Sequence, residues 1–147
     1  MQTTTPTDVS ALNSLLRGEM SAIETYRQAR EKVTPGEPGA AELERLQIDH
    51  RDAADALWHH IEGHGGKPSE GSGAWGAFAK AVEGTAKLLG NTAAIKALKE
   101  GEEHGLKDYQ DALEDKNLPT DCQTLLRGLL EKQRGHIATL DRLMQSV

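Results

Sequence analysis

The sequence holds a single cysteine, Cys122, which excludes an internal disulfide framework and any metal site built from several cysteines. Aromatic residues make up only 3% of the chain, and β-branched residues form no strand pattern anywhere. No run of about 18 apolar residues is present, and no charged and then apolar leader is followed by a small-residue cleavage site. We therefore expect an all-α, cytoplasmic protein that neither spans nor anchors to a membrane.

Positive charge is also scarce. Only 17 Lys and Arg residues face 23 Asp and Glu residues, so the formal net charge is -6 and the pI is about 5.5. The basic residues form no stripe with interleaved aromatics, which argues against a nucleic-acid partner and against an anionic membrane surface. With 147 residues the chain is long enough for one domain with a real core, and we expect a single domain over residues 1–147.

Apolar residues, in contrast, recur at spacings of three and four, which is the period of an amphipathic helix. The pattern predicts four long helices, from about residue 8 to 33, 40 to 63, 92 to 115 and 120 to 147. Glycine and serine predict a flexible linker at 63–73, and a shorter helix is predicted at 74–89. This crossover is long enough to run the length of a bundle, which predicts an up-down-down-up order. One side of the crossover helix has to be buried, on its own bundle or on a second subunit of a homodimer: Trp75, Phe78, Val82 and Leu89.

A carboxylate interrupts the apolar side of the first helix. Glu19 falls between Leu16 and Ile23 on the seam that should face the core. An ionised group taken from water costs several kcal/mol or more unless it is paired. Glu19 therefore needs a buried partner.

An internal repeat supplies candidate partners. Residues Gly18, Glu19 and Tyr26 recur 83 positions later as Gly101, Glu102 and Tyr109. The second and fourth long helices match at an offset of 86, where the pattern Gln-x-x-His occurs twice: Gln47 and His50, then Gln133 and His136. The chain is therefore predicted to be two copies of a helical hairpin, each with an inward Glu on its first helix and an inward Gln-x-x-His on its second.

The spacing allows these six polar groups to meet in one layer. At 1.5 Å per residue, Glu102 and Gln133 both lie about 20 Å from the loop between their helices, so an antiparallel hairpin places them level. The same count puts Glu19 about one turn out of level with Gln47 and His50 in the first hairpin. Tyr26 and Tyr109 are interpreted as core residues whose hydroxyls reach the layer.

This arrangement resembles the ferritin-like superfamily of carboxylate-bridged di-metal proteins. The stretch LLRGEMSAIETY is similar to the first-helix motif of bacterioferritins, including the tyrosine seven residues after Glu19. The GGKP linker, the interrupted crossover and GEEHGLKDYQDAL resemble still more closely a bacterial ferritin-like family catalogued as domain of unknown function 2383. The resemblance covers nearly the whole chain and implies a ferritin-like four-helix bundle with a stress-related or scaffold-like role. It also implies four metal ligands: Glu19, His50, Glu102 and His136.

Two positions depart from the ferritin-like pattern, because the two bridging glutamates fall on Gln47 and Gln133. A bridging ligand has to be anionic and share two oxygens between metals, whereas a neutral amide offers one weak oxygen donor and two N–H donors. Two carboxylates balance the charge of one divalent ion and not of two. We therefore do not expect a di-iron oxidase or ferroxidase centre.

Three interpretations of the layer stay open. It is a metal-free polar network, a site for a single Zn, Mn or Fe ion, or a true two-metal site. The first two make the protein a ferritin-like bundle that is not itself an oxidase. The rival is a metal-dependent oxidoreductase or metal-storage protein that uses the Glu/His site.

The remaining chemistry-bearing residues lie near the end of the second helix. His60 and His64 are spaced as a metal-binding pair at i and i+4, or they are solvated histidines that complement the helix C-terminus. Cys122 falls on an inward seam beside no obvious base, so we interpret it as small apolar filler.

Overall fold

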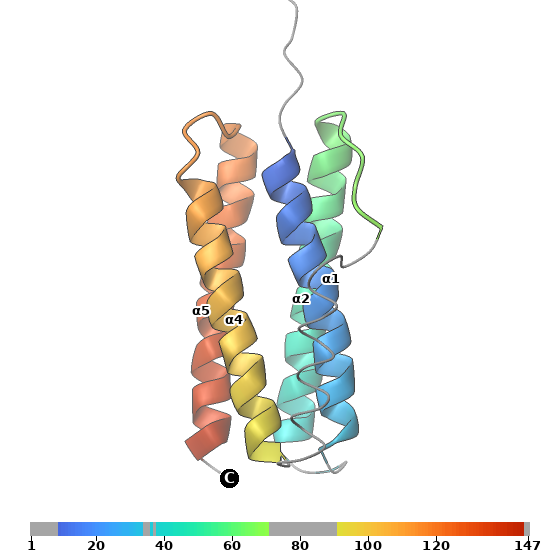
Figure 1. Cartoon of the computed structure of the whole chain (residues 1–147), viewed down its shortest axis with the longest axis vertical. Helices are drawn as coiled ribbons and strands as arrows, with labels where there is room; N and C mark the ends of the chain where they lie inside the picture. Colours follow the sequence, from blue (N-terminus) through green and yellow to red (C-terminus); the bar gives the residue numbers. More distant parts are fainter. Residues whose placement is uncertain (1–8, 34–35, 37, 71–90, 146–147) are drawn as a thin grey trace, which may run out of the picture.

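The computed structural model describes residues 9–33, 36, 38–70 and 91–145. These residues form four helices: α1 (Ser10–Glu31), α2 (Pro38–Gly63), α4 (Asn91–Leu113) and α5 (Thr120–Gln145) (Figure 1). The four long helices of the sequence-based prediction are thus confirmed, although α1 and α4 each end two residues earlier than predicted. The crossover helix predicted at 74–89, with its apolar side Trp75, Phe78, Val82 and Leu89, lies outside the described residues.

The helices form two hairpins that pack side by side (Figure 1). Helices α1 and α2 are antiparallel, as are α4 and α5, while α2 and α4 run in the same direction. Contacts between α1 and α4 and between α2 and α5 join the two hairpins. This is the predicted up-down-down-up bundle, and every helix therefore contributes one face to a shared interior.

The interior holds two apolar clusters with a polar layer between them. The first cluster lies toward the N-terminal end of α1 and has these largest members: Leu12, Leu16, Leu57, Ile61, Tyr109 and Leu126. The second lies toward the other end of α1 and has these: Tyr26, Leu43, Leu46, Ile95, Leu98 and Leu140. Burying one such side chain contributes roughly 1.5–3 kcal/mol, so the two clusters stabilise the bundle on both sides of the polar layer.

The first part of the predicted linker is held against α1. Asn13 donates a side-chain hydrogen bond to the carbonyl of Lys67 over 3.0 Å and accepts one from the amide of Ser69 over 2.8 Å. A Cβ on Gly66 would lie 2.4 Å from a methyl group of Val9, so only glycine allows this close approach. Residues 64–69 are therefore anchored rather than a free linker, because the amides of residues 64–66 donate to carbonyls of α2 and Asn13 of α1 binds the backbone of Lys67 and Ser69.

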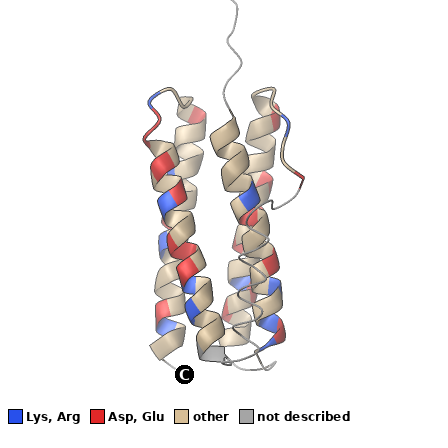
Figure 2. Ribbon diagram, in the orientation of Figure 1, with Lys and Arg blue, Asp and Glu red and all other residues tan. Residues whose placement is uncertain are grey.

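Acidic and basic residues are mixed along the helices, as Figure 2 shows. No basic stripe interrupts this mixture in the part of the chain that is described, which agrees with the acidic composition. Among the described helices, none is both long enough and apolar enough to cross a membrane.

Candidate metal centre

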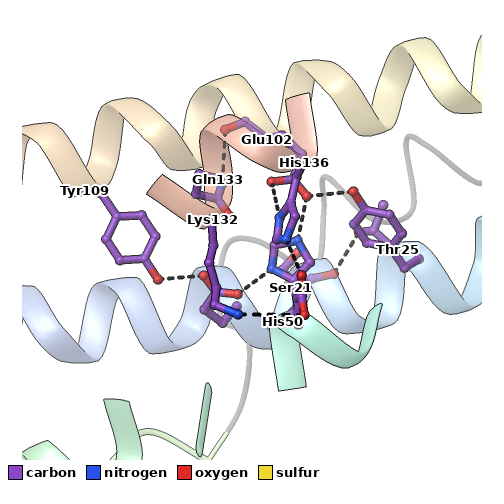
Figure 3. Close-up of polar contacts among 11 residues, drawn as sticks. Ser21, Thr25, His50, Glu102, Tyr109, Lys132, Gln133 and His136 are labelled. Carbon is purple, nitrogen blue, oxygen red and sulfur yellow. Dashed lines mark hydrogen bonds and ion pairs between the residues drawn. The ribbon is translucent and has the colours of Figure 1, made fainter. Parts of the chain in front are cut away.

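The polar layer receives side chains from all four helices. Glu19 comes from α1, Glu102 from α4, and a Gln and a His three residues apart come from each of α2 and α5. Figure 3 shows Glu102, Gln133 and both histidines of this layer. All six are buried, with exposed fractions of 2 to 4%: Glu19, Gln47, His50, Glu102, Gln133 and His136. The predicted meeting of these groups at the bundle centre is therefore observed.

His50 lies between the two carboxylates. Its Nδ1 is 2.5 Å from Oε2 of Glu19, and its Nε2 is 2.5 Å from Oε1 of Glu102. A ring that donates from both nitrogens is the cationic imidazolium. Burial lowers the pKa of His50, but the charges of Glu102 and Glu19 outweigh burial and hold this pKa well above its ordinary value.

Glu102 is the centre of the layer because it contacts both histidines. Its Oε2 lies 3.3 Å from Nδ1 of His136, and the rings of His50 and His136 have centroids 4.8 Å apart. Burial raises the pKa of Glu102, but the charge of His50 and the hydrogen bond from His136 hold this pKa well below its ordinary value. Glu102 is thus an anion to which a nitrogen of each histidine points.

The far nitrogen of His136 contacts a carboxylate that periodicity did not reveal. Its Nε2 lies 3.0 Å from Oδ2 of Asp49, whose side chain is 29% exposed. Lys132 stands 4.0 Å from the other oxygen of Asp49. The only sequence signal for Asp49 is its position next to His50, because it lies off the apolar seam of α2.

The two tyrosines close the layer from opposite sides. Tyr26 donates to Oε1 of Glu102 and Tyr109 donates to Oε1 of Glu19, both over 2.6 Å. Burial, and then the charge of the contacted carboxylate, raise the pKa of each phenol well above its ordinary value. Both hydroxyls therefore act as hydrogen-bond donors, as the sequence predicted, and each joins one hairpin to the carboxylate of the other.

The two glutamines bind backbone instead of the carboxylates. Gln133 donates from Nε2 to the carbonyl of Glu102 over 3.1 Å, and Gln47 donates to the carbonyl of Ile23 over 3.1 Å. Gln133 thus binds the backbone of the glutamate residue itself, whereas Gln47 binds the backbone four residues, or about one turn, beyond Glu19. This is the one-turn difference in level that the sequence predicted for the first hairpin. The Oε1 of Gln47 accepts from Arg30 over 2.6 Å, a contact the sequence analysis missed.

Three of the four predicted ligands form one group. Ligand atoms of His50, Glu102 and His136 lie within 4.8 Å of one another. Glu19, the fourth, contacts His50 on the nitrogen that faces away from Glu102. A histidine ligand usually donates its other N–H to a carboxylate or carbonyl. Glu19 is therefore placed to orient the ring of His50 rather than to bind the ion together with Glu102.

A cavity of about 40 Å³ borders the layer between α1 and α4. The two carboxylates and both tyrosines line it, together with small residues on the facing helices: Gly18, Ala22, Gly101 and Gly105. The volume accommodates at least one water-sized group beside the carboxylates. At Gly105 a Cβ would lie 2.6 Å from Nε2 of Gln133, so the glycine also makes room for that amide.

Comparisons with known proteins agree with this architecture. A family model described as a domain of unknown function (DUF2383) matches residues 7–115. A solved structure described as "ferritin like, diiron-carboxylate proteins from Bacillus anthracis str. Ames" is similar, with a TM-score of 0.75, 21% sequence identity, and coverage of 92% of this chain and 94% of that chain. At this identity the likeness shows the fold, a ferritin-like four-helix bundle. The comparison with curated proteins finds no match.

Proposed function

Because the chain belongs to the DUF2383 family of domains of unknown function and has a ferritin-like fold, we propose that its central layer binds one divalent metal ion. The ligands are His50, Glu102 and His136, and the ion is Zn, Mn or Fe. One observation supports this most: a nitrogen of each histidine points to Glu102, while its other nitrogen contacts a second carboxylate, Glu19 or Asp49. That is the arrangement in which protein histidines bind metals.

The donor set fits one ion better than two. Two imidazole nitrogens and a carboxylate form a compact three-ligand group, and Glu19 lies just behind it. A second ion would need further anionic ligands, yet both bridging positions carry neutral amides that are hydrogen-bonded to backbone carbonyls. Two divalent ions would also leave positive charge uncompensated in a buried layer, at a cost of several kcal/mol.

Hydrogen bonds within the chain would orient the ligands both in the metal-free and in the metal-bound state. In the metal-free state His50 keeps a proton on each nitrogen, and Tyr26 and Tyr109 donate to the carboxylates. Binding requires His50 to release its Nε2 proton, and Glu19 remains hydrogen-bonded to Nδ1, which fixes the ring orientation. The bound ion would supply positive charge and coordination that join α2, α4 and α5.

A metal-free network is the second candidate, and the completeness of the hydrogen bonding favours it. Within the described part of the chain, Gln28 Oε1 is the one buried side-chain atom that lacks a partner, and Gln28 is not in the layer. The buried polar atoms of the layer thus all have hydrogen-bond partners without a metal ion. Such a network would fix helix register and add little net stability.

The biological role is proposed on the family resemblance alone. A stress-related or scaffold-like role in the cytoplasm, with a homodimer as the assembly, is compatible with an acidic bundle. Metal storage or metal-dependent oxidoreduction remains the alternative, and the site would then have to turn over or release its ion. Neither metal storage nor oxidoreduction is supported by Gln47 and Gln133, because these neutral amides occupy the two positions where a di-metal site needs bridging carboxylates.

Calorimetric titration of metal-free protein with Mn²⁺ tests the proposed site. Mn²⁺ is suited to carboxylate and imidazole ligands rather than to thiolate. We expect one binding event per chain, weakened at least tenfold in His136→Gln and unchanged in His59→Gln, an exposed histidine of the same helical bundle. Absence of binding by the unmodified protein, or equal binding by His136→Gln, would instead favour the metal-free network.

A further inference from the structure

A second cluster of metal-ligating side chains lies at the end of the bundle where α2 ends and α5 begins. Its members come from the last turn of α2, the residue just after α2, and the first turn of α5: His60, His64, Asp121 and Cys122. His64 and Cys122 are each 14 residues from a central histidine, so the cluster is about 20 Å along the bundle axis from the central layer. It is therefore a separate place in the molecule.

The side chains of the cluster converge. The Nε2 of His64 lies 2.9 Å from Oδ2 of Asp121 and 3.4 Å from Sγ of Cys122. The Nε2 of His60 lies 4.0 Å from the same Asp121 oxygen. Donor atoms around a tetrahedral Zn²⁺ are about 3.3–3.7 Å apart, given metal-ligand bonds of about 2.0–2.3 Å. The observed separations bracket this value, and ligand atoms of His64, Asp121 and Cys122 lie within 4.8 Å of one another. Small side-chain movements would bring these three donors onto one ion, and His60 would have to move toward it to become the fourth ligand.

The histidine tautomer also suits a metal. The Nδ1 of His60 is 3.1 Å from the carbonyl of Ala56 and donates its proton there. The lone pair of the neutral ring then lies on Nε2, which faces Asp121. A histidine whose other nitrogen is fixed by a carbonyl is an oriented ligand.

The four side chains of the cluster differ in their exposure to solvent. Cys122 is fully buried, whereas the side chains of His60, His64 and Asp121 are 31%, 21% and 57% exposed. An ion can therefore enter from solvent past the exposed donors and meet the sulfur at the base of the site. Cys122 is a member of the first apolar cluster, as its interpretation as apolar filler requires. The expectation that no base lies beside it is wrong, because His64 reaches it from the end of another helix.

We infer that this end of the bundle carries a zinc site with four ligands: His60, His64, Asp121 and Cys122. The set of two imidazoles, a carboxylate and a thiolate is borderline to soft and matches Zn²⁺ in number and kind. Because α2 and α5 belong to different hairpins, a bound ion connects the end of α2 to the start of α5, beside the loop between α4 and α5. Binding releases the Cys122 thiol proton to solvent, and the proton that His64 donates from Nε2 to Asp121 has to leave that nitrogen, so affinity rises with pH.

Cobalt substitution tests this site without interference from the centre. Co²⁺ bound to a thiolate gives a near-ultraviolet charge-transfer band, and the central ligands include no sulfur. Added to reduced, metal-free protein, Co²⁺ should give this band with a final intensity of one thiolate-bound ion per chain, reached by two equivalents if the central layer also binds Co²⁺, and Zn²⁺ should abolish it. No band at several equivalents of Co²⁺ would overturn the inference.

Variants identify the ligands. Cys122→Ser should lose the band, and His64→Gln should weaken Co²⁺ binding at least tenfold while keeping the band at saturation. The exposed neighbour His59→Gln is the matched control and should bind as the unmodified protein does. Because His64 is partly exposed, its variant should fold even if Cys122→Ser does not. Unchanged Co²⁺ affinity in both His64→Gln and Asp121→Asn would refute the site. A failure here leaves the Mn²⁺ result at the centre unaffected.

Discussion

Replacing Glu19 tests how much the central layer depends on paired charge. In metal-free protein Glu19 neutralises His50 and accepts the hydroxyl of Tyr109, and all three side chains are buried. Glu19→Ala leaves the imidazolium with Glu102 alone on one side and removes the acceptor of Tyr109. Breaking a buried pair by removing one partner costs about 3–5 kcal/mol. We expect the free energy of unfolding at pH 6 to fall by that amount.

A matched series separates the charge from the packing. Glu19→Gln keeps the volume and an acceptor for Tyr109, so its cost isolates the lost charge and should be about 1.5–3 kcal/mol. Glu24→Gln removes a half-exposed carboxylate of the same helix, paired with Arg27, and should cost less than about 1 kcal/mol. Urea-induced unfolding in the presence of chelator gives all three values. A cost below about 1 kcal/mol for Glu19→Ala would refute the account of the layer as a tightly paired ion network.

Three further predictions concern the same layer. The raised pKa of His50 gives stabilisation that is complete below about pH 6.5 and lost as pH rises toward the folded-state pKa, while the lowered pKa of Glu102 adds stability above about pH 4.3. Metal-free protein should therefore unfold at higher urea at pH 6 than at pH 8.5, by a margin that shrinks in His50→Gln. Replacing all six Glu, Gln and His side chains of the layer by apolar residues of similar volume should leave stability equal or higher, in contrast to Glu19→Ala; a loss above about 3 kcal/mol would contradict this. The double variant Gln47→Glu, Gln133→Glu should raise the central capacity from one ion to two in the Mn²⁺ titration, and an unchanged capacity would show that the amides are not what limits it.

The central layer was predictable from sequence because burial and helical periodicity determine which side chains face inward. Glu19, His50, Glu102 and His136 lie on apolar seams, and a buried seam forces its polar members to find one another. Tyr26 and Tyr109 reach the carboxylates for the same reason. The positions of the proposed ligands followed from this pattern, whereas the contact of Glu102 with both histidines did not.

Contacts between helices that the seams do not describe were missed. Asp49 points about 100° around α2 from His50, toward α5, so periodicity assigns it to the surface. Only the packing of α2 against α5 places it 3.0 Å from His136. Similarly, Cys122 meets His64 because the end of α2 and the start of α5 lie at the same end of the bundle. Such contacts depend on helix crossing geometry, which local spacing does not encode.

The most direct test of the single-metal site is anomalous diffraction from crystals of the unmodified chain soaked in Zn²⁺. We predict one anomalous peak in the bundle centre, bound by His50 Nε2, His136 Nδ1 and Glu102, with Glu19 still contacting Nδ1 of His50. A peak at the end of the bundle would report separately on the cluster around Cys122. Two central peaks with Glu19 and Glu102 both as ligands, or no central peak at saturating Zn²⁺, would contradict the proposed site.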